Sequence, residues 1–163
     1  MSGLRVIELG QILAGPFAGA IFADLGAEVL KIERVDGGDD GRRMGPVFRG
    51  GDALSFHLFN RGKKSLALDL KSEAGLAAFE RLVASADILI HNLRPGVTHD
   101  MGIDGPSLCQ RHPRLIYGEI SAFGHTGPMQ FRPRYEPLLQ AFSGLSSTNG
   151  GPDDPPMRFG ASV

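Results

Sequence analysis

Residues 4–34 read LRVIELGQILAGPFAGAIFADLGAEVLKIER, and this stretch decides the fold. Its first six residues form an apolar run typical of a strand, and residues 29–32 form a second run of this kind. Between them, residues 17–25 have the apolar spacing of a helix, which Gly26 ends. Strand, turn, helix and strand in this order are the repeating unit of a parallel α/β sheet. Ligands of such sheets bind beyond the carboxyl ends of the strands, where residues 10–16 form the turn.

The same alternation continues along the chain. Expected strands cover residues 65–68, 86–90 and 115–120, and expected helices cover residues 73–84, 106–111 and 136–142. Ser72 is a candidate N-cap of the first of these helices. Residues 35–64 show no helix or strand periodicity, so we expect a long loop there, of the kind that is usually functional or disordered. The pattern predicts an α/β fold with a Rossmann-like parallel sheet and flanking helices.

Composition restricts the class of protein. The 163 residues are 42% hydrophobic and 21% charged, as expected for a globular domain with a real core. A net charge of -1 gives no indication of a nucleic-acid partner. We expect neither a membrane span nor a signal peptide, because no apolar run is long enough and the first residues lack the signal pattern. The single cysteine, Cys109, excludes an internal disulfide framework and favours a cytoplasmic location.

The turn at residues 10–16 carries neither of the two common phosphate-binding motifs. Gly10 and Gly15 lie five residues apart, so the GxGxxG pattern of nicotinamide-type dinucleotide proteins is absent. No Gly-Lys-Ser/Thr sequence follows, so the turn is not a P-loop either. The histidines share no spacing with carboxylates that suggests a metal site, and we expect no metal. His91 stands directly before a turn, and we expect it to face solvent.

Six sequence blocks, in the same order along the chain, resemble the class III coenzyme A transferases. That family includes formyl-CoA transferase and carnitine CoA-transferase, with the α-methylacyl-CoA racemases as relatives. The blocks are residues 10–16 with 25–34, then 59–65, 68–71, 92–96, 124–128 and 140–144. The resemblance covers the whole chain. It implies that the substrates are small molecules, namely coenzyme A as an acyl-CoA and a carboxylic acid.

The resemblance implies that the coenzyme lies along the strand ends of a Rossmann-like large domain. By position it implies phosphate contacts at Arg34 and Lys71, since arginine and lysine in loops can pair with phosphate charges. Asp100 stands where a formyl-CoA transferase has a coenzyme-contacting arginine, so Arg94 is the candidate to supply that contact. Without the resemblance, Arg34 and Lys71 also read as solvated surface charges.

The resemblance also implies contacts with the rest of the coenzyme. The implied contacts along the adenine and pantetheine are Leu68, Asn92 and Leu93, and those near the thioester are Leu13 and Ala14. Gln11 is a supporting candidate beside the substrate. Two polar residues have a simpler alternative, because Asn92 could close a turn and Gln11 could cap a backbone amide.

Residues 135 and 136 bear on the type of reaction. In the racemases a His-Asp pair stands here and moves a proton at the α-carbon, whereas this chain has Tyr135 and Glu136. Tyrosine lacks the near-neutral pKa that makes histidine a two-way proton carrier. We therefore favour CoA transfer, with both residues as supporting catalytic candidates. They could also merely begin a helix, and a racemase-type epimerase and a non-catalytic CoA-binding module stay open as alternatives.

The resemblance places the nucleophile of the reaction outside this sequence. In the family this nucleophile is an aspartate, which by position would lie about two residues beyond Val163. Members of the family are much longer than this chain. We therefore expect residues 1–163 to be the N-terminal part of an incomplete large domain, without the small domain and the C-terminal return, and to be inactive alone. Whole members form interlocked homodimers, and whether this chain associates stays open.

Overall fold

The computed structural model describes residues 1–132 and 135–160. The chain divides into two compact units, Met1–Ile120 and Ser121–Val163, and every strand of the described residues belongs to the first. Within the part of the chain that is described, no helix is both long and apolar enough to cross a membrane.

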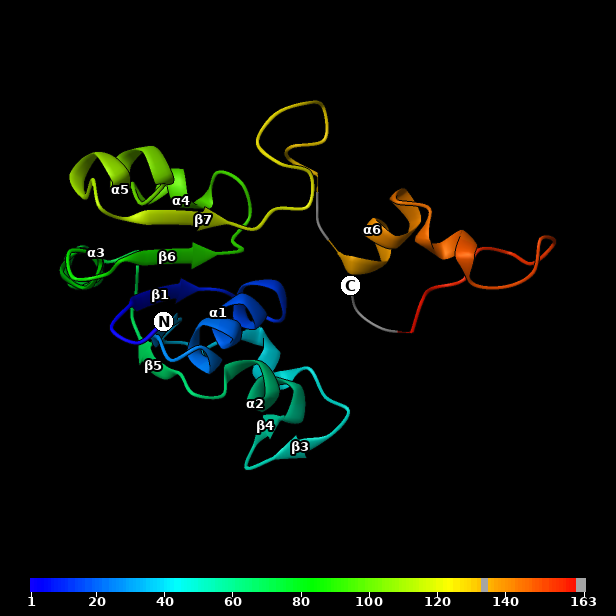
Figure 1. Ribbon diagram of the computed structural model, residues 1–163, viewed down its shortest axis with the longest axis horizontal. Helices are drawn as coiled ribbons and strands as arrows, with labels where there is room; N and C mark the ends of the chain where they lie inside the picture. Colours follow the sequence, from blue (N-terminus) through cyan, green and yellow to red (C-terminus); the bar gives the residue numbers. More distant parts are fainter. Residues whose placement is uncertain (133–134, 161–163) are drawn as a thin grey trace. The chain divides into compact units, whose positions relative to one another are not determined.

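The first unit is built on five parallel strands in the order β5-β2-β1-β6-β7 (Figure 1). The strands are β1 (Arg5–Leu9), β2 (Glu28–Glu33), β5 (Lys64–Ala67), β6 (Ile88–His91) and β7 (Ile116–Glu119). The chain runs from β1 to one edge of the sheet and then returns to β6 on the other side of β1. This reversal places the switch point between β1 and β6, where doubly wound sheets bind their ligands. The predicted Rossmann-like sheet is confirmed.

Helices cover both faces of this sheet. They are α1 (Ala14–Asp24), α3 (Glu73–Val83), α4 (Val97–Asp100) and α5 (Gly105–Arg111). Neighbouring residues of β1 point to opposite faces. Val6 belongs to the core cluster on which Phe22 of α1 packs, and Ile7 belongs to the cluster that contains Phe79 of α3 and Leu108 of α5. The central strands are therefore apolar on both sides, as in other sheets of this class.

Helix α1 begins at Ala14, three residues before its predicted start. The start of the helix packs directly on the end of β1, because a Cβ atom on Gly15 would lie 2.7 Å from the Cα atom of Gly10. Glycine at both positions allows this close approach. Ser72 caps α3 as predicted, accepting a hydrogen bond from the Gly75 N–H at 3.0 Å. The other predicted helices and strands are found with small shifts at their ends.

The prediction of a loop over residues 35–64 is wrong. This segment contains the 3-10 helix η1 (Asp40–Arg43), the hairpin strands β3 (Phe48–Arg49) and β4 (Asp52–Ala53), and the helix α2 (Leu54–Asn60), which packs against α1. These elements are too short to show a periodicity in the sequence. Arg42 ties them together, since it pairs with Glu33 and Asp52 at 2.7 Å each and lies 3.9 Å from the centre of the Phe56 ring.

The second unit contains α6 (Glu136–Phe142), at its predicted bounds, and the 3-10 helix η2 (Leu145–Thr148). Gln140 of α6 is buried, and its side-chain oxygen accepts a hydrogen bond from the Phe159 N–H at 2.7 Å. Arg158 pairs with Glu136 at 3.0 Å. The last described residues therefore fold back onto α6.

Candidate functional site

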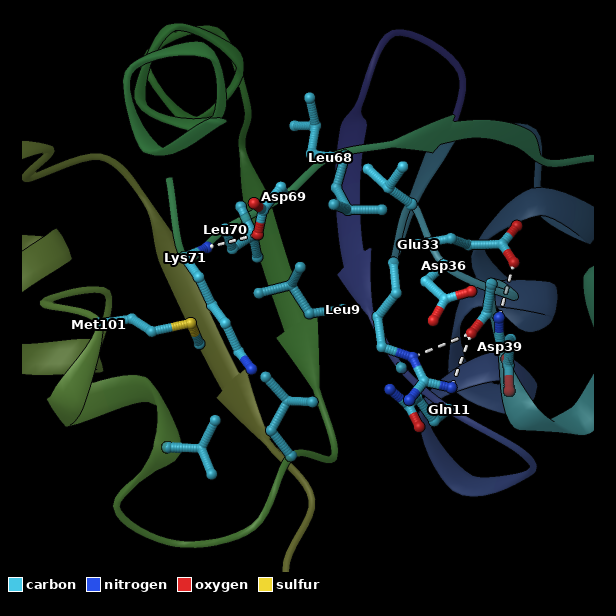
Figure 2. A pocket seen from close by; sticks show the side chains of 17 residues that line it. Leu9, Gln11, Glu33, Asp36, Asp39, Leu68, Asp69, Leu70, Lys71 and Met101 are labelled. Atoms are coloured by element: carbon cyan, nitrogen blue, oxygen red, sulfur yellow. Dashed lines mark hydrogen bonds between the residues drawn. The ribbon is translucent and has the colours of Figure 1, made fainter. Parts of the chain in front are cut away.

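A pocket of about 610 Å³ lies at the carboxyl ends of β1, β2 and β5 (Figure 2). Residues that follow β6 also line it, so it occupies the switch point of the sheet. Its volume is in the range of sites for small organic ligands. The predicted site residues that line it are Gln11, Arg34, Leu68, Lys71 and Leu93. These residues come from distant parts of the chain and share the pocket because four parallel strands end at the same edge of the sheet.

The lining combines apolar and charged groups. Its apolar part includes Leu9, Ile32, Leu70, Val97 and Met101, which the sequence analysis did not single out. Figure 2 shows the Lys71 side chain extended on the same side as Met101, with Asp36, Asp39 and Gln11 on the other side. Such a pocket suits a ligand with a flat or aliphatic part and an anionic part.

Arg34 lines the pocket with a half-exposed side chain that already has partners. Its guanidinium donates to the Gly38 carbonyl at 3.0 and 3.1 Å and pairs with Asp40 at 2.6 Å. The hydrogen bond from Arg34, helped by Arg43 and opposed by partial burial, lowers the pKa of Asp40. An anion that binds Arg34 therefore competes with an ionised carboxylate.

Lys71 is placed differently. Its backbone N–H donates to Asp69 Oδ1 at 3.0 Å, which turns the chain just after β5. Within residues 1–132 and 135–160, no ion pair engages its ammonium group. Of the two cations in the described pocket lining, Lys71 is therefore the one that can bind an anionic ligand without first breaking an ion pair with a carboxylate.

Asn92 acts on the neighbouring turn. Its Oδ1 atom accepts a hydrogen bond from the Gln11 N–H at 2.8 Å, and its Nδ2 atom donates to the Gln11 carbonyl at 3.0 Å. The described pocket lining does not include Asn92. The Asn92 side chain, which we expected beside the adenine and pantetheine, thus holds the backbone of Gln11. Gln11 itself lines the pocket.

The remaining residues of the turns lie outside the described pocket lining. Leu13 is the N-cap residue of α1, Ala14 is its first residue, and Arg94 is exposed after β6. Ile12, between Gln11 and Leu13, has a φ of 66°, which is rare for a β-branched residue. The turn that presents Gln11 to the pocket therefore has a strained backbone.

Tyr135 and Glu136 stand at the start of α6 in the second unit. Tyr135 is the N-cap residue, and its side chain is 74% exposed. Glu136 is in the first turn and pairs with Arg158. Both positions are compatible with the alternative in which the pair begins a helix.

His91 corrects another expectation, because it is buried and only 1% exposed. Its Nδ1 atom accepts a hydrogen bond from the Leu93 N–H at 3.2 Å, and its Nε2 atom lies 2.8 Å from the Tyr117 hydroxyl. Burial raises the pKa of Tyr117 to about 12. Among the described residues, histidine, cysteine and carboxylate side chains form no group that could hold a metal ion.

Sequence reasoning missed four charged side chains that meet next to the pocket. Glu8, Lys31, Asp39 and Lys63 are each at most 2% exposed. Lys31 lies 2.9 Å from Glu8 and 2.8 Å from Asp39, and Lys63 lies 2.6 Å from Glu8. Burial lowers the pKa of Lys63, and the nearby Glu8 carboxylate offsets part of that effect. A signal was present, because Glu8 and Lys31 interrupt two apolar runs that pair in the sheet.

Known proteins with similar sequences support a specific family. The sequence model described as CoA-transferase family III matches residues 1–163. The chain is 44% identical to succinate–glutarate CoA-transferase of Agrobacterium fabrum, over 100% of this chain and 42% of that protein. It is 46% identical to acetyl-CoA:oxalate CoA-transferase of Acetobacter aceti, over 97% of this chain and 40% of that protein.

A solved structure agrees with these similarities. The crystal structure of a CAIB/BAIF family protein from Brucella suis matches with a TM-score of 0.92 and 42% sequence identity. The match covers 99% of this chain and 43% of that chain. The chain thus spans about two fifths of the length of the relatives named here.

Proposed function

Because the chain belongs to CoA-transferase family III, we propose that its pocket holds coenzyme A while CoA moves from an acyl-CoA to a carboxylic acid. The observation that carries this proposal is that Arg34, Lys71, Leu68 and Leu93 line one pocket at the switch point of the sheet. The sequence resemblance implied coenzyme contacts at these four positions. The printed names of the relatives, which are CoA-transferases, support the same reaction class.

In the proposed complex, the phosphates of the coenzyme pair with Lys71 and Arg34, and Arg94 reaches toward them from the turn after β6. Leu68 and Leu93 contact the adenine and the pantetheine. Charged hydrogen bonds to phosphate fix the anionic end, and apolar contacts hold the rest of the molecule. Asn92 contributes through the Gln11 backbone that it holds.

The thioester end lies near Leu13 and Ala14 in this proposal, and the reaction passes through an aspartate. Its carboxylate attacks the thioester carbonyl, which breaks the C–S bond and leaves an acyl-aspartyl anhydride and the CoA thiolate. The thiolate attacks the aspartyl carbonyl, which releases the first carboxylic acid as its carboxylate and forms an aspartyl-CoA thioester. The acceptor carboxylate then repeats both exchanges in reverse order. We propose that this aspartate lies outside residues 1–163, so these residues alone are not expected to turn over substrate.

Tyr135 and Glu136 are proposed supporting residues of that reaction. A racemase would need a proton carrier here, and tyrosine is a poor one near neutral pH. A full-length form would therefore exchange CoA between carboxylic acids and leave the α-proton of a 2-methylacyl-CoA in place. Exchange of that α-proton with deuterated solvent, without CoA transfer, would show the racemase alternative to be the better one.

Binding of coenzyme A to the 163-residue chain tests the proposal directly. Calorimetry should show saturable binding, which Arg34→Ala should weaken about tenfold and Lys71→Ala more strongly, up to about a hundredfold, since a hydrogen bond to a charged group is worth about 1.5–3 kcal/mol. Lys64→Ala is the matched control, because Lys64 is exposed and pairs with Glu28 on the sheet edge. If Lys71→Ala and Arg34→Ala bind coenzyme A as tightly as the Lys64→Ala control, the two proposed phosphate contacts are wrong.

Turnover tests the second part of the proposal. The chain is incubated with succinyl-CoA and a second dicarboxylate, and thioester exchange is followed by mass spectrometry. We expect none from residues 1–163, and measurable exchange would show that the nucleophile lies within them.

The cytoplasmic location and an interlocked homodimer of the whole protein are further proposals, and the homodimer is checked by light scattering.

A further inference from the structure

The turn from Gly10 to Leu13 holds a backbone conformation that its sequence does not favour. Ile12 has a φ of 66°, in the left-handed region, where a branched Cβ is strained. Strain of this kind persists only where the surroundings over-determine it. Leu13 closes the turn with a hydrogen bond from its N–H to the Gln11 carbonyl at 3.0 Å.

Three side chains from distant segments hold this turn. Asn92 holds both backbone polar groups of Gln11. Lys31 donates to the Gly10 carbonyl at 2.7 Å. Asp39 Oδ1 accepts from the N–H of the strained Ile12 itself, at 2.9 Å. Of the three, Asp39 acts on the residue that carries the strain.

Asp39 is in turn fixed from several sides. Its Oδ1 atom also accepts from the Gly41 N–H at 2.8 Å, and its own N–H donates to Glu33 at 2.9 Å. Among the described residues its Oδ2 atom accepts no hydrogen bond and instead faces the Lys31 ammonium at 2.8 Å. Lys31 and Lys63 share Glu8, so two cations and two anions balance in a buried group. A carboxylate held in this way cannot easily turn away from Ile12.

The two segments that the hydrogen bond from Ile12 to Asp39 joins both line the pocket. Gly10 and Gln11 line it from the turn, and Gly38 and Asp39 line it from the loop after β2. We propose that Asp39 is a positioning residue, whose carboxylate keeps the turn at Ile12 in the strained form that accepts the coenzyme. The inference rests on the proposed function of the pocket, but the hold on the turn can be measured without coenzyme.

The test compares coenzyme A binding to the 163-residue chain and its variants by calorimetry. Asp39→Ala should lower the affinity about tenfold, because strain is no longer opposed and the competent turn is less populated. Ile12→Gly removes the strain, since glycine adopts positive φ freely. In the Asp39→Ala background it should therefore restore most of the lost affinity. A purely structural role for Asp39 predicts no such rescue, because Ile12→Gly also removes packing. Asp24→Ala, at an exposed carboxylate paired with Arg61, is the control.

A second variant covers the case in which Asp39→Ala fails to fold. Lys31→Met combined with Asp39→Ala removes one cation and one anion and leaves Glu8 paired with Lys63. Lys31→Met alone is its reference, because Lys31 also donates to the Gly10 carbonyl. Circular dichroism checks its fold, and Ile12→Gly should rescue binding in this background too. Wild-type affinity in either variant, or a folded variant that Ile12→Gly does not rescue, would overturn the proposal.

Amide hydrogen exchange separates this inference from the proposed function. The Ile12 amide should be protected in the wild-type chain and exchange faster in Asp39→Ala, with no coenzyme present. If coenzyme A does not bind but the exchange rates differ as expected, the proposed function is wrong. The inference that Asp39 holds the turn at Ile12 is then still supported. Equal exchange rates at Ile12 in both chains would show that Asp39 holds nothing there.

Discussion

At the scale of single residues, the ion pair between Arg34 and Asp40 determines how readily the Arg34 guanidinium can bind an anion in the pocket. Both side chains are about half exposed, and their atoms lie 2.6 Å apart. An exposed pair of this kind contributes about 0.2–1 kcal/mol, so it is a weak competitor for a phosphate. Lys71 has no such competitor among the described residues, and we expect it to be the stronger of the two contacts.

We predict that Asp40→Asn strengthens the binding of coenzyme A. Loss of the carboxylate frees Arg34 and removes a negative charge near the phosphates, which should lower the dissociation constant about two- to fivefold. Calorimetry at low salt measures the effect, which should shrink as salt screens it. Asp24→Asn is the control, because this exposed carboxylate pairs with Arg61 and is not part of the pocket lining described here. Weaker binding in Asp40→Asn would show that Asp40 orders Arg34 for the ligand.

The lowered pKa of Glu33 predicts how the free energy of unfolding depends on pH. Burial opposes its ionisation, but hydrogen bonds from Arg42, Ser65 and the Asp39 N–H outweigh burial and lower its pKa to about 2. Because this pKa is lower in the folded chain than in the unfolded chain, Glu33 stabilises the fold above about pH 4.5. That stability should be lost as the pH falls from about 4.5 toward 2.

The pH prediction is checked with urea unfolding between pH 7 and pH 3. Glu33→Gln should lower the stability at pH 7 and flatten its fall below pH 4.5. Glu73→Gln is the control, since Glu73 is exposed and forms no ion pair with the described residues. An unchanged acid profile in Glu33→Gln would show that other carboxylates dominate acid unfolding.

At the scale of elements, the contact between α1 and β1 depends on Gly19. A Cβ atom at Gly19 would lie 2.1 Å from Glu8 Oε2 and 3.0 Å from Lys63 Nζ. Glu8 is held on both sides by lysines and cannot move aside without breaking a buried ion pair. The helix therefore lies directly over the buried charges.

We predict that Gly19→Ala destabilises the chain by about 1–3 kcal/mol through overpacking. Helix propensity alone predicts the opposite, a gain of about 1 kcal/mol. Thermal and urea unfolding measure the difference. Gly160→Ala is the control for a Cβ atom added without a clash, because among the described residues no atom lies within 4 Å of the place that this Cβ would take. A more stable Gly19→Ala chain would mean that α1 can move away from β1 at little cost.

The elements also show where sequence reasoning succeeds. Helix α6 has its predicted bounds and Ser72 caps α3, because periodicity and capping are encoded within a few neighbouring residues. Helix α2 and the β3–β4 hairpin went unpredicted, since their stability comes from contacts such as the one between Arg42 and Phe56. His91 was expected to face solvent because it precedes a turn, yet its contact with Tyr117 keeps it buried.

At the scale of the whole molecule, the chain separates into two compact units, and the pocket belongs to the first. Every residue of its described lining lies between Leu9 and Met101. The five parallel strands and both core clusters belong to the same unit. The unit therefore contains the elements that a domain needs to fold alone.

We predict that residues 1–120 fold without residues 121–163 and keep the pocket that we propose binds coenzyme A. The shortened chain should unfold in a single cooperative transition and bind coenzyme A within about threefold of the 163-residue chain. Circular dichroism and calorimetry measure the two properties. A shortened chain that folds but no longer binds coenzyme A would show that residues 121–163 contribute to the site.

Outside residues 35–64, the sequence by itself determined the order of strands and helices, the parallel sheet, and the resemblance that pointed to Arg34, Leu68, Lys71 and Leu93. Tertiary structure alone decided that these residues share one pocket, that Asn92 acts on a backbone, and that four charges are buried together. The physical reason is the distance along the chain. Periodicity and caps depend on residues a few positions apart, whereas Lys63 meets Glu8 across 55 residues only because β1, α1 and the segment before β5 pack together.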